Sequence, residues 1–250
     1  MNKESTNISD IINLQTLGKK MENDYGFLGV PNNTFEESGR NQLITLLEQG
    51  LLPTSKVLEI GCGVLRVGYW LIHFLDKECY YGIEPAKYRI EIGKKHLLSS
   101  EILADKNPQF NFNSVFDTSV FNTKFDFFLS GSIWTHCSKK SIKIMLDGFT
   151  NNTNESAVFL TSYIPAMFKK NDYQGNDWVG TSHESDVSGC IKHSRSWIKL
   201  QCEKRGLILE KLSRDAFDGQ YWLKITKQKT PKLTKGIYHQ LKRKVKIIFH

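Results

Sequence analysis

Apolar positions along the chain follow two alternating patterns, one typical of buried strands and the other typical of amphipathic helices. Short continuous apolar runs predict strands at 56–60, 80–83, 110–112, 125–129 and 157–163. Apolar residues spaced three and four positions apart predict intervening helices over 70–75, 86–98 and 139–149. Because strands that alternate with helices form parallel sheets covered on both faces, the pattern predicts a doubly wound α/β fold.

The segment before the first strand is expected to be mainly helical. The sequence predicts a short helix at 8–22 and a loop at 25–33 that contains glycine and proline. A second helix is expected from Thr34 to about Gly50. Thr34 and Glu37 have the spacing of a capping box at its start.

The end of the chain departs from the alternation. After a helix at 195–205, strands at 207–212 and 221–227 follow with no helix between them. We therefore expect them to form an antiparallel hairpin at the sheet edge. The predicted sheet has seven strands, mostly parallel, with an antiparallel edge strand.

The pattern also suggests a division of the chain. Residues 1–34 form an N-terminal helix and loop, 35–227 form one domain, and 228–250 form a basic tail. Within the domain, residues 164–194 are rich in Gly, Asp, Asn, His and Trp and lack periodicity. Long irregular connections in compact domains are often functional, so this segment is the predicted substrate loop.

Charge is distributed unevenly. Nine of the 34 basic residues and none of the 26 acidic residues lie in 224–250, so the rest of the chain is nearly neutral. A neutral body lacks the basic groove that nucleic acid requires, which argues against a nucleic-acid partner. The tail alternates basic and apolar residues; peripheral contact with an anionic membrane, docking on the body or a partner, and disorder all stay open.

Cysteine usage favours a reducing compartment. Five cysteines with no CxxC pair do not suggest a disulfide framework or a zinc site. No apolar run is long enough to cross a bilayer and the first residues lack a signal-peptide pattern, so we expect a cytoplasmic protein, with membrane association left open. The acids and histidines of 164–194 match no metal-site spacing, and we expect no metal.

Two glycines and one carboxylate suggest a ligand site. Gly61 and Gly63 follow the first predicted strand, and Glu84 ends the second. In a doubly wound sheet, ligands bind beyond the carboxyl ends of the strands. Glycine lets a ligand approach the backbone, and a carboxylate accepts hydrogen bonds from ribose hydroxyls.

These motifs resemble the class I S-adenosylmethionine (SAM)-dependent methyltransferases, a family with a Rossmann-like fold. VLEIGCG at Val57–Gly63 is similar to the family's first motif, and YYGIEP at Tyr80–Pro85 is similar to the second. The segments at 125–130 and 132–136 resemble its fourth-strand region, and the resemblance extends over about 35–227. It implies SAM as the cofactor and a methyltransferase as the activity.

The resemblance also implies which residues contact the cofactor. Glu59, Gly61 and Gly63 would line its methionine and ribose parts, Glu84 would hold the ribose, and a residue near 113–117 would approach the adenine. The complete set of cofactor candidates is Glu59, Gly61, Cys62, Gly63, Arg66, Glu84 and Ser130.

Two positions depart from related patterns. Many family members have a third glycine where this chain has Leu65, and Arg66 occupies the third glycine of the dinucleotide fingerprint G-x-G-x-x-G. The second departure favours SAM over a nicotinamide cofactor. Arg66 itself has two interpretations. It pairs with an anion, which is either the SAM carboxylate or an anionic substrate, or it is a solvent-facing helix residue.

Methyl transfer from a sulfonium needs alignment of the acceptor and, for a hydroxyl acceptor, a general base. Histidine is suited to that role near neutral pH. The catalytic candidates are His136, His183 and His193, and the substrate-binding candidates are Asp172, Tyr173, Asp177 and Trp178. Each of the histidines also has a purely structural interpretation, which for His136 is capping of the following helix.

The acceptor is predicted by exclusion. The sequence after 125–129 is Ser-Gly-Ser-Ile rather than the N/D-P-P-Y/F motif of base-directed amino-methyltransferases, which favours oxygen acceptors. We expect a small polar molecule such as a sugar or nucleotide-linked glycan. The family resemblance implies polysaccharide biosynthesis as its setting, because methyltransferases that resemble this chain often accompany that process. The alternatives are an RNA- or protein-directed methyltransferase and a non-catalytic partner subunit with the same fold.

Overall fold

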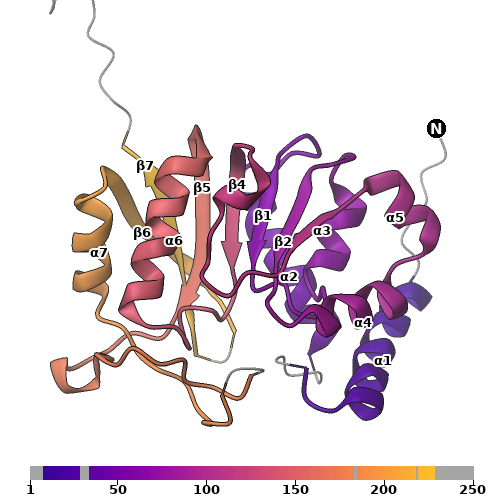
Figure 1. Cartoon of the computed structure of the whole chain (residues 1–250), viewed down its shortest axis with the longest axis horizontal. Helices are drawn as coiled ribbons and strands as arrows, with labels where there is room; N and C mark the ends of the chain where they lie inside the picture. The colour runs from indigo at the N-terminus through magenta and orange to yellow at the C-terminus, as the bar shows by residue number, and fades with distance from the viewer. Residues whose placement is uncertain (1–7, 29–33, 183–184, 218, 229–250) are drawn as a thin grey trace, which may run out of the picture.

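A seven-stranded sheet in the order β3-β2-β1-β4-β5-β7-β6 forms the centre of the molecule (Figure 1). The computed structural model describes residues 8–28, 34–182, 185–217 and 219–228. The strands are β1 (Val57–Ile60), β2 (Tyr80–Ile83), β3 (Gln109–Asn111), β4 (Phe125–Ser130), β5 (Thr153–Tyr163), β6 (Leu207–Asp215) and β7 (Tyr221–Lys227). The first five are parallel, and β7 pairs antiparallel with both β5 and β6. The predicted seven-stranded, mostly parallel sheet with its antiparallel edge is confirmed.

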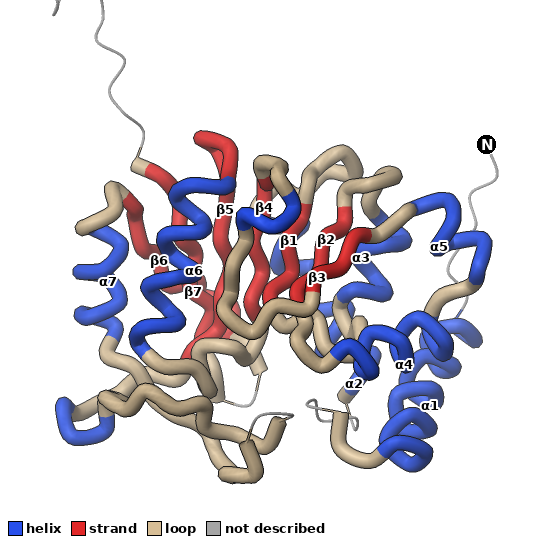
Figure 2. The backbone as a smooth tube through the Cα atoms, in the orientation of Figure 1, coloured by secondary structure: helices blue, strands red, loops and turns tan. Residues whose placement is uncertain are grey.

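Helices cover both faces of the sheet (Figures 1 and 2). They are α1 (Ile8–Tyr25), α2 (Phe35–Glu48), α3 (Gly68–Phe74), α4 (Lys87–Leu97), α5 (Ser100–Lys106), α6 (Lys139–Asn152) and α7 (Arg195–Glu203), with short 3₁₀ turns at Ser119–Phe121 and Lys169–Asn171. Side chains of α1 to α4 share one apolar core, and those of α6 and α7 share the other.

Strand β1 shows how the sequence builds these two cores. Val57 packs in the first core, whereas Leu58 and Ile60 pack in the second, because successive side chains point to opposite faces. All four residues of β1 are buried, as expected for a central parallel strand. The carboxyl end of β1 is therefore held rigidly from both sides.

One helix was not predicted, and one local prediction was wrong. Helix α5 was not predicted because none of its residues is buried, so it leaves no apolar periodicity in the sequence. Thr34 does precede α2, but its side chain accepts no capping bond from the backbone; the Thr34 hydroxyl oxygen instead accepts a hydrogen bond from the Ser38 hydroxyl.

The segment 164–194 is irregular, as expected, and runs along the carboxyl edge of the sheet (Figure 2). Its two ends are joined by a short bridge between Pro165 and His193. Hydrogen bonds from the main-chain N–H of His193 to Ile164 and from that of Ala166 to His193 close this base. The segment is thus a loop anchored at its base.

Candidate cofactor and acceptor site

The turn after β1 bends through left-handed backbone conformations. Gly61 has φ +76°, and a Cβ added there would lie 2.2 Å from Cδ1 of Ile133. Gly63 has φ +51°, and a Cβ added there would have no neighbour within 4 Å. A side chain at Gly61 would be strained by the positive φ and would displace the end of the Ile133 side chain, while at Gly63 the lack of a side chain leaves open space for a ligand.

Glu84 directly follows β2 and faces this turn. Its Oε2 accepts a hydrogen bond of 3.1 Å from the main-chain N–H of Gly63, and its Oε1 accepts one of 3.0 Å from that of Ala86. The side chain is buried, and Nη1 of Arg89 lies 4.0 Å from Oε1. The structure therefore brings the glycine turn and the carboxylate together, as the sequence predicted.

The position of the missing third glycine keeps a glycine-like backbone. Leu65 has φ +63°, although its side chain is fully buried. The turn is clamped on both sides by glycines of neighbouring helices. A Cβ on Gly39 of α2 would meet the carbonyl oxygen of Arg66 at 2.5 Å, and one on Gly93 of α4 would meet that of Val64 at 2.6 Å. Burial of Leu65 and these close helix contacts hold the strained turn in place.

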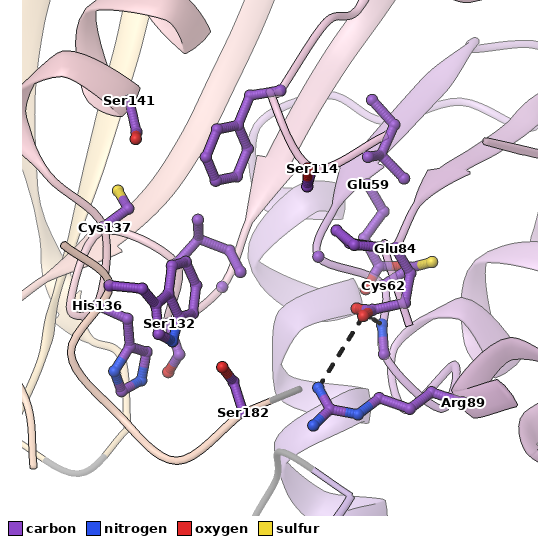
Figure 3. A pocket seen from close by; sticks show the side chains of 18 of the residues that line it. Glu59, Cys62, Glu84, Arg89, Ser114, Ser132, His136, Cys137, Ser141 and Ser182 are labelled. Atoms are coloured by element: carbon purple, nitrogen blue, oxygen red, sulfur yellow. Dashed lines mark hydrogen bonds and ion pairs between the residues drawn. The ribbon is translucent and has the colours of Figure 1, made fainter. Parts of the chain in front are cut away.

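A cavity of about 230 Å³ opens beside the turn. Glu59, Cys62, Glu84 and Arg89 line one end, and His136, Cys137 and Ser141 line the other (Figure 3). Asn113, Ser114 and Phe116 also contribute to the wall, in the region expected to approach an adenine. The cavity is therefore elongated, with different chemistry at its two ends.

Glu59 is a buried acid in the cavity wall. Burial raises its pKa to about 8, even though the hydrogen bond of 2.6 Å from the Tyr80 hydroxyl and the charge of Arg66 both oppose the increase. Arg66 also lines the cavity, with its guanidinium 5.6 Å from the centroid of the Phe217 ring. The structure thus places Arg66 at the site, largely buried, and not on a solvent-facing surface.

His136 lies at the opposite end of the cavity. Its Nδ1 is 2.6 Å from the carbonyl oxygen of Val179, so Nδ1 carries the proton and donates it. Its ring stacks on Trp178, which also lines the cavity, with centroids 5.4 Å apart and an interplanar angle of 26°. Burial lowers the pKa of His136, and the hydrogen bond to Val179 only partly opposes this. The imidazole of His136 is therefore neutral, and its Nε2 can accept a hydrogen bond.

Ser132 is a cavity residue that the sequence did not single out. It has φ +59°, a conformation uncommon for a residue with a side chain. Its main-chain N–H donates to the Ser162 hydroxyl, and its own hydroxyl accepts from the Gln220 amide, both at 2.7 Å. Gln42 of α2 also lines the cavity, and its side chain is buried. Ser132 lies in the segment 132–136 that resembles the family pattern, but the pattern did not reveal its role, and no motif marks Gln42; the placement of both side chains depends on long-range packing.

Several candidate residues lie away from the cavity. Ser130 is fully buried and donates its hydroxyl proton to Thr161. His193 is also fully buried, and its Nε2 bonds to the carbonyl oxygen of Cys137. Asp177 is exposed and does not line the cavity. These residues have positions that suit structural or surface roles.

Asp172 and Tyr173 belong to the scaffold of the irregular loop. Asp172 pairs with Lys139 and accepts from the main-chain N–H of Ser194, and the Tyr173 hydroxyl donates to the carbonyl oxygen of Asp177. His183 and the basic tail from 229 onward lie outside the described residues. Within the described ranges, no group of three His, Cys, Asp or Glu side chains is arranged to hold a metal, and no helix is long and apolar enough to cross a membrane.

Comparison with known proteins identifies the fold, although sequence matches are few. No protein-family model matches the chain. A curated relative, an uncharacterized protein of Rickettsia prowazekii, is 30% identical over 115 residues, which is 45% of this chain and 44% of that protein. The match thus spans less than half of either chain.

The structure is similar to solved methyltransferases over most of its length. Magnesium protoporphyrin IX methyltransferase from Synechocystis, solved with bound S-adenosylhomocysteine (SAH), is 14% identical; the match covers 86% of this chain and 95% of that one, with a TM-score of 0.56. A SAM-dependent methyltransferase from Clostridium acetobutylicum is 10% identical, with 84% and 97% covered and a TM-score of 0.57. The chain has the class I methyltransferase fold, as the sequence motifs predicted.

Proposed function

We propose that the protein binds SAM and transfers its methyl group to a hydroxyl of a small polar acceptor, such as a sugar or a nucleotide-linked glycan. The observation that carries the proposal is the contact between the Gly63 main chain and Glu84 at the wall of one cavity. The sequence predicted both groups as halves of one adenosyl site. The class I methyltransferase fold places them at the carboxyl edge of the sheet, where ligands of such sheets bind.

The cavity residues fit this cofactor. Space is open beside Gly63, and Glu84 is buried with its carboxylate at the cavity. Arg66 supplies a cation suited to a carboxylate, and Asn113 is a polar group suited to a base edge. When bound, SAM supplies an electrophilic methyl group on a sulfonium.

The residues of the chain would then orient the acceptor and accept its proton. His136 is neutral, its Nδ1–H is committed to Val179, and its Nε2 is the acceptor atom that remains. Nε2 of His136 takes the hydroxyl proton as the acceptor oxygen gains its methyl group. Stacking on Trp178 fixes the ring plane and keeps the base in one orientation.

The polarity of the acceptor end supports a neutral, hydroxyl-rich molecule. Among the described residues, its lining includes hydroxyl and amide side chains but no lysine or carboxylate: Ser132, Ser138, Ser141, Asn176, Thr181 and Ser182. Such groups exchange hydrogen bonds with hydroxyls, and an aromatic ring such as Trp178 packs against the apolar face of a sugar. The solved methyltransferases of this fold act on several classes of acceptor, so this support comes from the lining alone.

Calorimetry with SAH tests the proposal. We expect saturable binding to the wild-type protein and, for Glu84→Ala, a loss of about 1–3 kcal/mol in binding free energy, because ribose hydroxyls lose a charged acceptor. Ser130→Ala is the control, because this residue lies outside the cavity. Absence of SAH binding by folded wild-type protein would reject the proposed function.

A further inference from the structure

Arg89 is the most under-satisfied buried cation among the described residues of the cavity. Its side chain is only 9% exposed, yet it forms no side-chain hydrogen bond with any described residue, and its Nε is buried without a partner. Its ion-pair partner within the described part of the chain is Glu84, at 4.0 Å. A guanidinium has five N–H donors, and leaving a buried one such as the Nε–H of Arg89 unpaired is costly.

The place of Arg89 suggests what would satisfy it. It lies on α4, lines the cavity, and points beneath Glu84 toward the cavity interior (Figure 3). The backbone already supplies one donor to each oxygen of the Glu84 carboxylate. An ionised carboxylate accepts about four hydrogen bonds, so about one acceptor position remains on each oxygen.

A vicinal diol matches this arrangement in number and polarity. Its two O–H groups donate to the two remaining acceptor positions on Glu84, and each hydroxyl oxygen is then left with lone pairs that need a donor. Arg89 provides such donors from the side facing Glu84. Glu84 alone satisfies the protons of the diol but leaves its oxygens unpaired.

We propose that Arg89 is a second ribose-recognition residue, which donates hydrogen bonds to the diol oxygens while Glu84 accepts from the diol protons. This inference rests on the proposed function, because it takes the adenosyl ribose as the diol. It assigns the 9%-exposed guanidinium a role in ligand selection beyond charge compensation of Glu84. Ligands that lack the diol would lose interactions with both side chains.

The test compares two ligands that differ only in the diol. Binding of 5′-methylthioadenosine and of its 2′,3′-dideoxy analogue is measured by calorimetry for the wild type and for Arg89→Met. The dissociation constant of the dideoxy analogue divided by that of 5′-methylthioadenosine reports how much the diol contributes to binding. We expect this ratio to fall about tenfold or more in Arg89→Met, since hydrogen bonds to charged groups contribute about 1.5–3 kcal/mol.

Controls separate recognition from structural support. Lys94→Met removes a cation that lies on the same helix but does not line the cavity, and we expect it to leave the ratio unchanged. A purely structural role for Arg89 would weaken both ligands equally, and an unchanged ratio in Arg89→Met would overturn the inference. Arg89→Gln, which keeps a donor, replaces Arg89→Met if the latter does not fold.

The outcomes also distinguish this inference from the function on which it rests. If the folded wild type binds neither SAH nor 5′-methylthioadenosine, the proposed function fails and the role of Arg89 fails with it. If both ligands bind and Arg89→Met keeps the wild-type ratio, only the role of Arg89 is rejected.

Discussion

Nζ of Lys139 lies 2.6 Å from Oδ2 of Asp172, in an ion pair that ties the first turn of α6 to the irregular loop. Asp172 also accepts from the main-chain N–H of Ser194, just before α7. One carboxylate therefore joins three segments at the base of the loop that carries Trp178. Its position explains how a segment without regular structure can hold a cavity residue in a fixed place.

Asp172→Asn should lower stability without weakening cofactor binding. Burial would raise the pKa of Asp172, but hydrogen bonds from Lys139 and Ser194 outweigh it, so the pKa is lowered. Removing the charge leaves Lys139 without its partner, and we expect a loss of about 3 kcal/mol in the free energy of unfolding. Urea denaturation measures this loss; Asp177→Asn, at an exposed site in the same loop, is the control.

The pH dependence of the Asp172 contribution follows from its lowered pKa. The stabilisation is fully present above the unfolded pKa near 3.8 and is lost as the pH falls through the folded value. The difference in stability between wild type and Asp172→Asn should therefore shrink below about pH 4. A difference that stays constant with pH would show that the ion pair is not its source.

His136→Gln should reduce turnover while leaving SAH affinity close to the wild-type value. Loss of a general base costs about 10²–10⁴-fold in kcat. Burial lowers the pKa of His136 below its usual 6.5, and the neutral ring is the active form, so the rate should fall only as the pH drops below that value. Rate profiles against pH, with the acceptor identified, measure both effects. An unchanged kcat in His136→Gln would remove this residue from the mechanism.

Gly61, Gly63 and Glu84 could be predicted because local patterns determine their positions. A buried strand followed by a glycine turn ends at the carboxyl edge, and the next strand along the chain ends at the same edge. Asp172 and His193 could not be assigned in this way, since their orientation depends on long-range bonds such as that from His193 to Ile164. Neither their residue types nor their spacing revealed that they anchor the loop.

Arg89 and Ser130 also show that a motif does not determine which side chains reach the cavity. Arg89 reaches the cavity because of the way α4 packs beside the glycine turn, and no motif marked it. Ser130 matched the family pattern at the end of β4, yet its hydroxyl points to Thr161 on the neighbouring strand. Proximity to a motif predicts the region of a site, whereas the direction of each side chain follows from packing.

Glu59→Gln should stabilise the free protein at alkaline pH. The folded pKa of Glu59 is raised by burial to about 8, from a model-compound value of 4.5. The folded state therefore holds a proton that the unfolded state releases, and stability falls as the pH rises between these values. Glutamine keeps an acceptor for Tyr80 and does not titrate, so the variant should gain up to a few kcal/mol relative to wild type above pH 8. Chemical denaturation at pH 5 and pH 9 measures this; an equal difference at both pH values would contradict it.

Gly61→Ala and Gly63→Ala should separate packing from ligand access, although they lie two residues apart. Both glycines have positive φ, so alanine costs about 1–2 kcal/mol of stability at either position. Gly61→Ala also forces its Cβ against Ile133 and should lose more, a loss that Ile133→Val partly restores by removing the Cδ1 atom. Gly63→Ala meets no protein atom, and its methyl group occupies the open space beside Glu84. Its SAH affinity should therefore fall by more than its stability loss accounts for. Wild-type SAH affinity in folded Gly63→Ala would mean that the ligand does not approach this turn.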